Sequence, residues 1–114
     1  MAKYNKTEDE FSRQIKPIVA TAETPTIYNV TMTTADTQYS QALSAGVQKF
    51  IIHTRDGTAY RFAYVTGKVA TPTAPYFSMP ANSIYSEDLI SGDAKTLYFA
   101  CASDAKVIEI IEWV

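Results

Sequence analysis

Hydrophobic and polar positions alternate most regularly between Val47 and Val65, in the stretch VQKFIIHTRDGTAYRFAYV. Two runs rich in β-branched and aromatic residues flank the segment Arg55-Asp56-Gly57, a pattern that predicts a β-hairpin. A three-residue turn with Gly57 in the left-handed conformation is favoured over a two-residue turn at Asp56-Gly57, because it separates the side chains cleanly into two faces. It sets Phe50 opposite Phe62 and Ile52 opposite Tyr60.

The two faces of this predicted hairpin differ in character. The face expected to point into a core carries large apolar side chains: Phe50, Ile52, Tyr60, Phe62 and Tyr64. The outward face is mixed, with Lys49, Ile51, His53, Arg55 and Arg61. Ile51 is the outward residue least compatible with water, so we expect it to contact a partner.

Alternation with a period of two continues elsewhere and predicts further short strands. Expected strands are TIYNVTMT from Thr26, DTQYSQAL, Tyr76–Met79, a piece around Ile84 and Tyr85, KTLYFACA and KVIEIIEWV, the last two forming a second hairpin. Residues 66–75 hold a glycine and two prolines and are expected to form a surface loop. The pattern therefore predicts an all-β fold, an antiparallel β-sandwich or jelly-roll-like barrel of about seven or eight short strands.

Residues 1–25 differ in composition from the predicted domain of residues 26–114. The stretch KYNKTEDEFSRQ is polar and mixed in charge, and Thr7 with Glu10 has the spacing of a capping box. We expect an extended N-terminal arm with a short helix over about residues 8–15, which Pro17 would end. The arm carries a small apolar side that suggests docking onto a partner, formed by Phe11, Ile15, Ile18 and Val19.

Composition narrows the function classes. The chain of 114 residues is 46% hydrophobic and 19% charged, with a net charge of −2 and a pI near 5.3. Nucleic acid and anionic membranes call for clustered Lys and Arg, so neither partner is expected. The N-terminus shows no apolar stretch typical of a signal peptide, which indicates synthesis in the cytoplasm.

Candidate catalytic chemistry is sparse. His53 is the single histidine and has no recognisable nucleophile motif to accompany it, so we predict a structural role and no enzyme activity. Cys101 is expected to pack as a small apolar residue. No metal site or cofactor is predicted, because His53 and Cys101 do not make a zinc site. Glu109 and Glu112 lie three apart on a strand, hence on opposite faces, and we expect Glu112 near an edge or paired with a basic residue.

Tyrosine is the most suggestive residue type. Eight tyrosines exceed what so small a core accepts with every hydroxyl satisfied, so several should lie at the surface or in an interface. Exposed rings also suit a carbohydrate-binding or host-recognition module, which stays open as an alternative function.

Three segments follow one another between roughly Tyr39 and Val114: KFIIHTRDGTAYRFAYV, then YFSMPANSIYSED, then KTLYFACASDAKVIEIIEWV. In this succession the chain resembles small β-rich structural proteins of tailed bacteriophages. The resemblance implies a virion component made in the host cytoplasm, foremost a capsid decoration or cement protein that binds the major capsid protein or other virion proteins. It also implies self-association, with a trimer favoured. A head–tail connector or a tail or fibre accessory protein is the neighbouring alternative.

Overall fold

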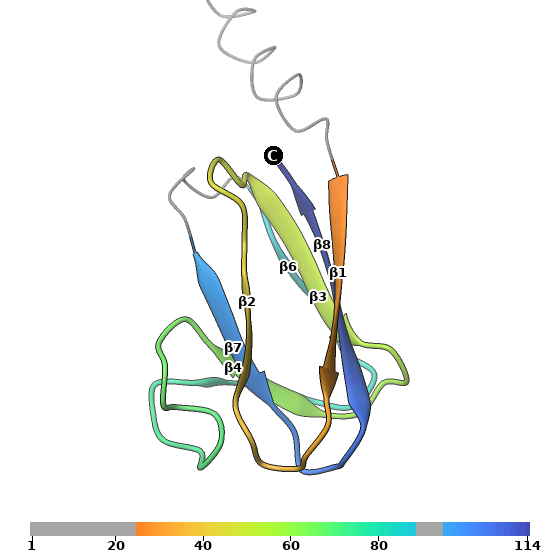
Figure 1. The fold of residues 1–114 in the computed structure, drawn as a ribbon, viewed down its shortest axis with the longest axis vertical. Coiled ribbons are helices and arrows are strands. Elements are labelled where there is room, and N and C mark those ends of the chain that lie inside the picture. The colour runs from red at the N-terminus through yellow and green to blue at the C-terminus, as the bar shows by residue number, and fades with distance from the viewer. Residues whose placement is uncertain (1–24, 89–94) are drawn as a thin grey trace, which may run out of the picture.

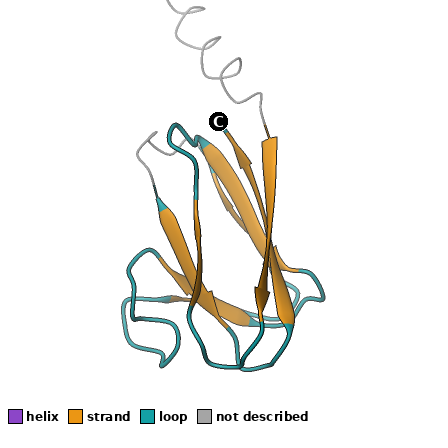
Figure 2. Ribbon diagram, in the orientation of Figure 1, coloured by secondary structure: helices purple, strands orange, loops and turns teal. Residues whose placement is uncertain are grey.

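The structure is a computed structural model that describes residues 25–88 and 95–114 (Figure 1). All of its regular elements are β-strands joined by loops (Figure 2). The eight strands are β1 (Pro25–Met32), β2 (Tyr39–Ala42), β3 (Lys49–Thr54), β4 (Tyr60–Ala63), β5 (Phe77–Met79), β6 (Tyr85–Glu87), β7 (Thr96–Ala100) and β8 (Lys106–Trp113).

The strands form two antiparallel four-stranded sheets. One sheet has the order β1-β8-β3-β6 and the other β2-β7-β4-β5. We call them sheet A and sheet B, and Figure 1 shows them facing one another. Every consecutive pair of strands except β4 and β5 lies in opposite sheets. This is the strand order of a jelly roll, so the predicted fold class is confirmed.

Both predicted hairpins are wrong as strand pairings. β3 lies in sheet A between β8 and β6, whereas β4 lies in sheet B between β7 and β5. Ile52 is therefore opposite Ile110 and Tyr85, and Phe62 is opposite Phe77 and Phe99. β7 and β8 are separated in the same way. Alternation along a strand predicts which side chains point inward. It does not distinguish a hairpin from two strands in facing sheets, because both arrangements bury the same side chains.

The left-handed conformation predicted for Gly57 is confirmed, but the three-residue hairpin turn around it is not. Gly57 has a left-handed φ of +83°, and its carbonyl accepts a hydrogen bond from the Asn82 backbone N–H at 2.8 Å. A Cβ atom there would lie 2.2 Å from Asn82 Oδ1, so glycine is required on both counts. The Arg55 N–H donates a hydrogen bond to the Val107 carbonyl, so the chain after β3 stays paired with β8 and does not fold back onto β3.

The core lies between the two sheets. Sheet A contributes Met32, Phe50, Ile52, Ile108 and Ile110, and sheet B contributes Tyr60, Phe62, Met79, Leu97 and Phe99. Cys101 is buried within this cluster, as its strand position predicted. Side chains of both sheets interdigitate in such a sandwich, which is why each strand shows a period of two.

Glu112 is fully buried, and the expectation that it lies at an edge or pairs with a basic residue was wrong. β8 is an inner strand between β1 and β3. The carboxylate accepts hydrogen bonds from the Ser44 N–H at 3.0 Å, the Ser44 hydroxyl at 2.5 Å and the Tyr28 hydroxyl. The hydrogen bond to Glu112 raises the pKa of Tyr28. Neutral donors thus satisfy this charge, and they tie β1 and the link before β3 to β8.

Candidate functional site

The outer face of sheet A carries a row of isoleucines across three adjacent strands. Ile27 of β1 lies opposite Ile111 of β8, which lies opposite Ile51 of β3. Ile84, just before β6, flanks the row. Ile27 and Ile84 are 66% and 65% exposed. Ile51 was predicted to be the least water-compatible outward residue, and the structure places it within this row.

These four residues, Ile27, Ile51, Ile84 and Ile111, line a hollow that we call the isoleucine groove. Its volume is about 290 Å³, and His53, Glu109 and Ile110 complete its lining. Ligand pockets for small molecules span roughly 300–1,000 Å³, so the groove suits a few apolar side chains. Clustered aliphatic side chains on an outer sheet face are typical of contact surfaces.

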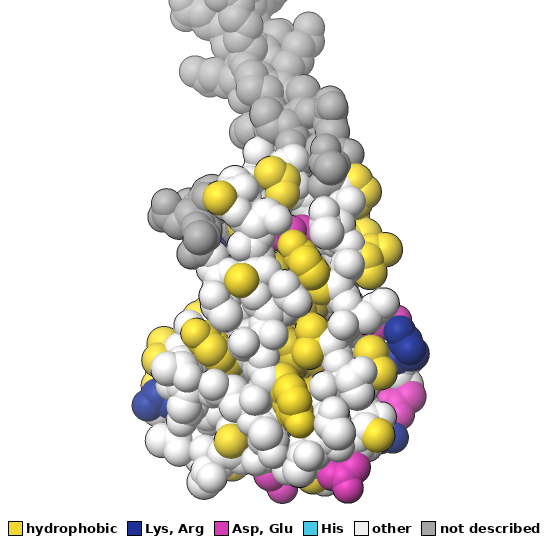
Figure 3. All heavy atoms as spheres, viewed as in Figure 1, with side chains coloured by type: hydrophobic (Ala, Val, Ile, Leu, Met, Phe, Trp, Pro, Cys, Tyr) yellow, Lys and Arg dark blue, Asp and Glu magenta, His cyan; other side chains and the backbone are white. Residues whose placement is uncertain are grey.

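Charged side chains border the isoleucine groove at both ends. At one end Glu109 accepts a hydrogen bond from Arg55 Nε at 2.9 Å and lies 3.4 Å from His53 Nε2. At the other end the Lys49 ammonium lies 5.0 Å from the Trp113 ring centroid and 3.7 Å from Asp88. Figure 3 shows hydrophobic side chains above a group of acidic and basic ones along the right-hand edge of the molecule. An apolar centre with a polar rim is the usual anatomy of a protein–protein interface.

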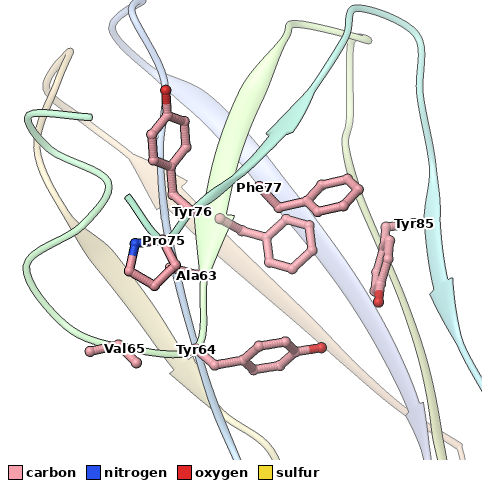
Figure 4. A pocket seen from close by; sticks show the side chains of 8 residues that line it. Ala63, Tyr64, Val65, Pro75, Tyr76, Phe77 and Tyr85 are labelled. Carbon is pink, nitrogen blue, oxygen red and sulfur yellow. The ribbon is translucent and has the colours of Figure 1, made fainter. Parts of the chain in front are cut away.

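A second exposed cluster lies where β4, β5 and β6 meet at the open edge of the sandwich. Tyr64, Tyr76, Phe77 and Tyr85 surround a cavity of about 330 Å³, which we call the aromatic pocket (Figure 4). Phe77 is 53% exposed and Tyr64 47% exposed. Phe62 forms the inner wall, with its ring centroid 5.5 Å from Phe77 and 5.0 Å from Tyr85. The placement of Tyr64 in the core was therefore wrong.

The aromatic pocket has one polar end. Tyr64 and Tyr85 reach toward one another, whereas the Tyr76 ring points away from both of them (Figure 4). Tyr85 donates a hydrogen bond to the Glu87 carboxylate, which raises the pKa of Tyr85. Burial raises the pKa of Tyr64. Both phenols therefore remain protonated at neutral pH, beside a carboxylate that can accept hydrogen bonds.

The loop that contributes Tyr64 and Tyr76 is held in place by Arg61. Its guanidinium donates hydrogen bonds to the carbonyls of Val69, at 2.5 Å, and Ala70, at 3.0 Å, and to Asp36 at 2.8 Å. Val69, which belongs to this loop, is fully buried. The surface loop expected over residues 66–75 is confirmed, but its anchor and the pocket were missed, since residues from four separate segments build them.

Most other sequence candidates have ordinary surroundings. His53 lies half-buried on the outer face, with Nδ1 2.8 Å from the Thr54 carbonyl. Cys101 Sγ donates to the Ser103 carbonyl. Within residues 25–88 and 95–114 no three His, Cys, Asp or Glu residues gather as metal ligands, and no helix is long and apolar enough to cross a membrane. The arm residues Phe11, Ile15, Ile18 and Val19 lie outside the described residues.

Comparisons with known proteins add little. No protein-family model matches the chain, and no curated protein matches its sequence. A similar solved structure is the solution NMR structure of a de novo designed double-stranded β-helix, with 12% sequence identity and a TM-score of 0.48. The match covers 81% of this chain and 100% of the designed chain.

Proposed function

We propose that the protein is a structural component of a tailed-bacteriophage virion, foremost a capsid decoration or cement protein. The observation that carries this proposal is the isoleucine groove, which gives a small β-module an apolar surface suited to binding other proteins. The resemblance of residues 39–114 to phage structural proteins supports the same class. Fold alone does not decide function, so the groove and the resemblance carry the argument.

In this proposal the module binds by protein–protein contact. The groove buries its isoleucines against a virion protein, and charged side chains such as Arg55 and Lys49 at the rim orient the contact. The arm of residues 1–24 takes part in the same assembly, so that several weak contacts act together. A decoration protein stabilises a head in this way because it binds assembled subunits and not dispersed ones.

The test is binding to assembled heads of the phage that encodes the chain. The wild-type protein should co-sediment with heads at a fixed ratio to the major capsid protein. Ile27→Glu, which puts a charge into the groove, should weaken binding about tenfold or more, because burial of an unpaired charge is costly. Ser40→Glu adds the same charge to the outer face of sheet B and should bind as the wild type does. Sedimentation with tails alone would favour a connector or tail position, and absence from purified virions would refute the proposal.

The aromatic pocket supports a second candidate, a carbohydrate-binding or host-recognition module. The exposed rings of Tyr64 and Phe77 can stack on the apolar face of a sugar, and Tyr85 with Glu87 can bind its hydroxyls. A glycan array with the purified chain tests it. Binding that Phe77→Ala abolishes and Ile27→Glu leaves unchanged would support this candidate, and an array without binding would exclude it.

A further inference from the structure

The isoleucine groove has a candidate occupant in the chain itself. We propose that the N-terminal arm of one copy, through residues 11–19, binds in the isoleucine groove of a second copy. This inference rests on the proposed function, in which the groove is a protein-contact surface, and it names the partner at that surface.

The first argument is the unsatisfied apolar area of the groove. Ile27 and Ile84, on its two sides, each leave about two thirds of their surface in water. Burial of such apolar surface is favourable roughly in proportion to the area removed from water. Within the described residues the chain leaves them uncovered, so a partner that covers both sides at once has much to gain.

The second argument is the complementary composition of the arm. Twenty-four residues precede Pro25, and within nine of them stand four large apolar residues: Phe11, Ile15, Ile18 and Val19. The surrounding sequence is polar and charged, so these side chains have little else in the arm to pack against. A groove with a few isoleucines and an arm with a few apolar side chains match in size and chemistry.

The third argument is where the arm is attached. Pro25 begins β1 opposite Trp113, and Ile27 of the groove follows two residues later. Val19 is six residues before Pro25, a reach of roughly 20 Å in extended form. The apolar part of the arm is therefore tethered within roughly 20 Å of the edge that carries Ile27, a length sufficient to reach the groove of a copy packed beside it.

The attachment also favours a second copy over the arm's own groove. Thr24 precedes a proline, and the residue before proline prefers extended backbone. Residues 20–24, ATAET, contain none of the Gly, Pro, Asn or Asp residues that make tight reversals. Binding to the chain's own groove would need a reversal within these five residues, so the sequence favours a second copy as the acceptor. An exchange of arms between copies closes a symmetric oligomer.

Cross-linking between two differently labelled preparations tests this directly. Full-length Ile15→Cys, labelled with ¹⁵N, is mixed with unlabelled full-length Ile84→Cys and oxidised briefly, while the native Cys101 remains buried. Mass spectrometry should find a disulfide between an arm peptide and a groove peptide of different label. Ser40→Cys in place of Ile84→Cys is the matched control and should yield at least tenfold less product. Equal yields from Ile84→Cys and Ser40→Cys would overturn the proposal.

Sedimentation of the full chain gives the second readout. The wild type and Ser40→Glu should associate, whereas Ile15→Glu in the arm and Ile27→Glu in the groove should each weaken association about tenfold or more. Unchanged circular dichroism spectra would show that the variants are folded. A monomeric wild type, or a double variant with Ile15→Cys and Ile84→Cys that forms the disulfide only within one chain, would also refute it. These measurements need no virion. Arm exchange can therefore be refuted while head binding is observed, and head binding can be absent while arm exchange is observed.

Discussion

The two faces of β8 carry nearly the same kinds of side chain and use them in opposite ways. The inner face presents Ile108, Ile110 and Glu112, all buried. The outer face presents Val107, Glu109, Ile111 and Trp113, all only partly buried. Each face therefore has aliphatic side chains and one glutamate, yet the inner face is fully covered by the rest of the fold and the outer face stays partly exposed to water.

The two glutamates make the contrast concrete. Glu112 is surrounded by neutral donors from Tyr28 and Ser44, which replace water inside the sandwich. Glu109 is paired with the Arg55 guanidinium and lies 3.4 Å from His53 Nε2 at the surface, where water remains available. Inside, a carboxylate helps to hold the fold together. Outside, a carboxylate borders an apolar groove and suits the rim of an interface.

The largest expected effect separates the aliphatic side chains of the two faces. Ile110→Ala should reduce the free energy of unfolding by about 2–5 kcal/mol, because it leaves a cavity in a packed core. The adjacent Ile111→Ala should cost about 1 kcal/mol or less in the isolated chain, since only sheet-surface packing is lost. Chemical denaturation at low protein concentration, where association contributes least, measures both. Similar losses for the two variants would contradict the assignment of the outer face as only partly covered.

A smaller effect separates the two glutamates. Glu112→Gln should reduce the free energy of unfolding by about 1–3 kcal/mol, because an amide offers one acceptor oxygen to three donors and leaves a buried group unsatisfied. Glu109→Gln should change it by less than about 1 kcal/mol, as for other surface ion pairs.

Salt distinguishes the causes of these two losses. The effect of Glu109→Gln should fade in 1 M sodium chloride, where surface charges are screened, and that of Glu112→Gln should persist. Tyr28→Phe removes one donor to Glu112 and serves as the control for that cluster. A loss at Glu109 that equals the loss at Glu112 would mean that the outer ion pair also holds the fold.

Local sequence chemistry determined a large part of this protein. A period of two separated Phe50, Ile52, Tyr60 and Phe62 from the outward residues, because side-chain direction depends only on backbone pleat. Gly57 marked a left-handed turn, since other residues are strained there. The same period of two identified Ile51 as an apolar residue that points outward. The all-β class and most strands followed from these local rules.

Only the tertiary structure decided which strands pair. β3 and β4 are close in sequence but belong to different sheets. The sequence could not reveal this, because a hairpin and two facing sheets satisfy the inward alternation equally well. That pairing turned Ile51 from a single exposed residue into the middle of the isoleucine groove, and it gathered Tyr64, Phe77 and Tyr85 around the aromatic pocket. Candidate sites of this kind depend on contacts between distant segments, which hydrophobic periodicity along one segment does not encode.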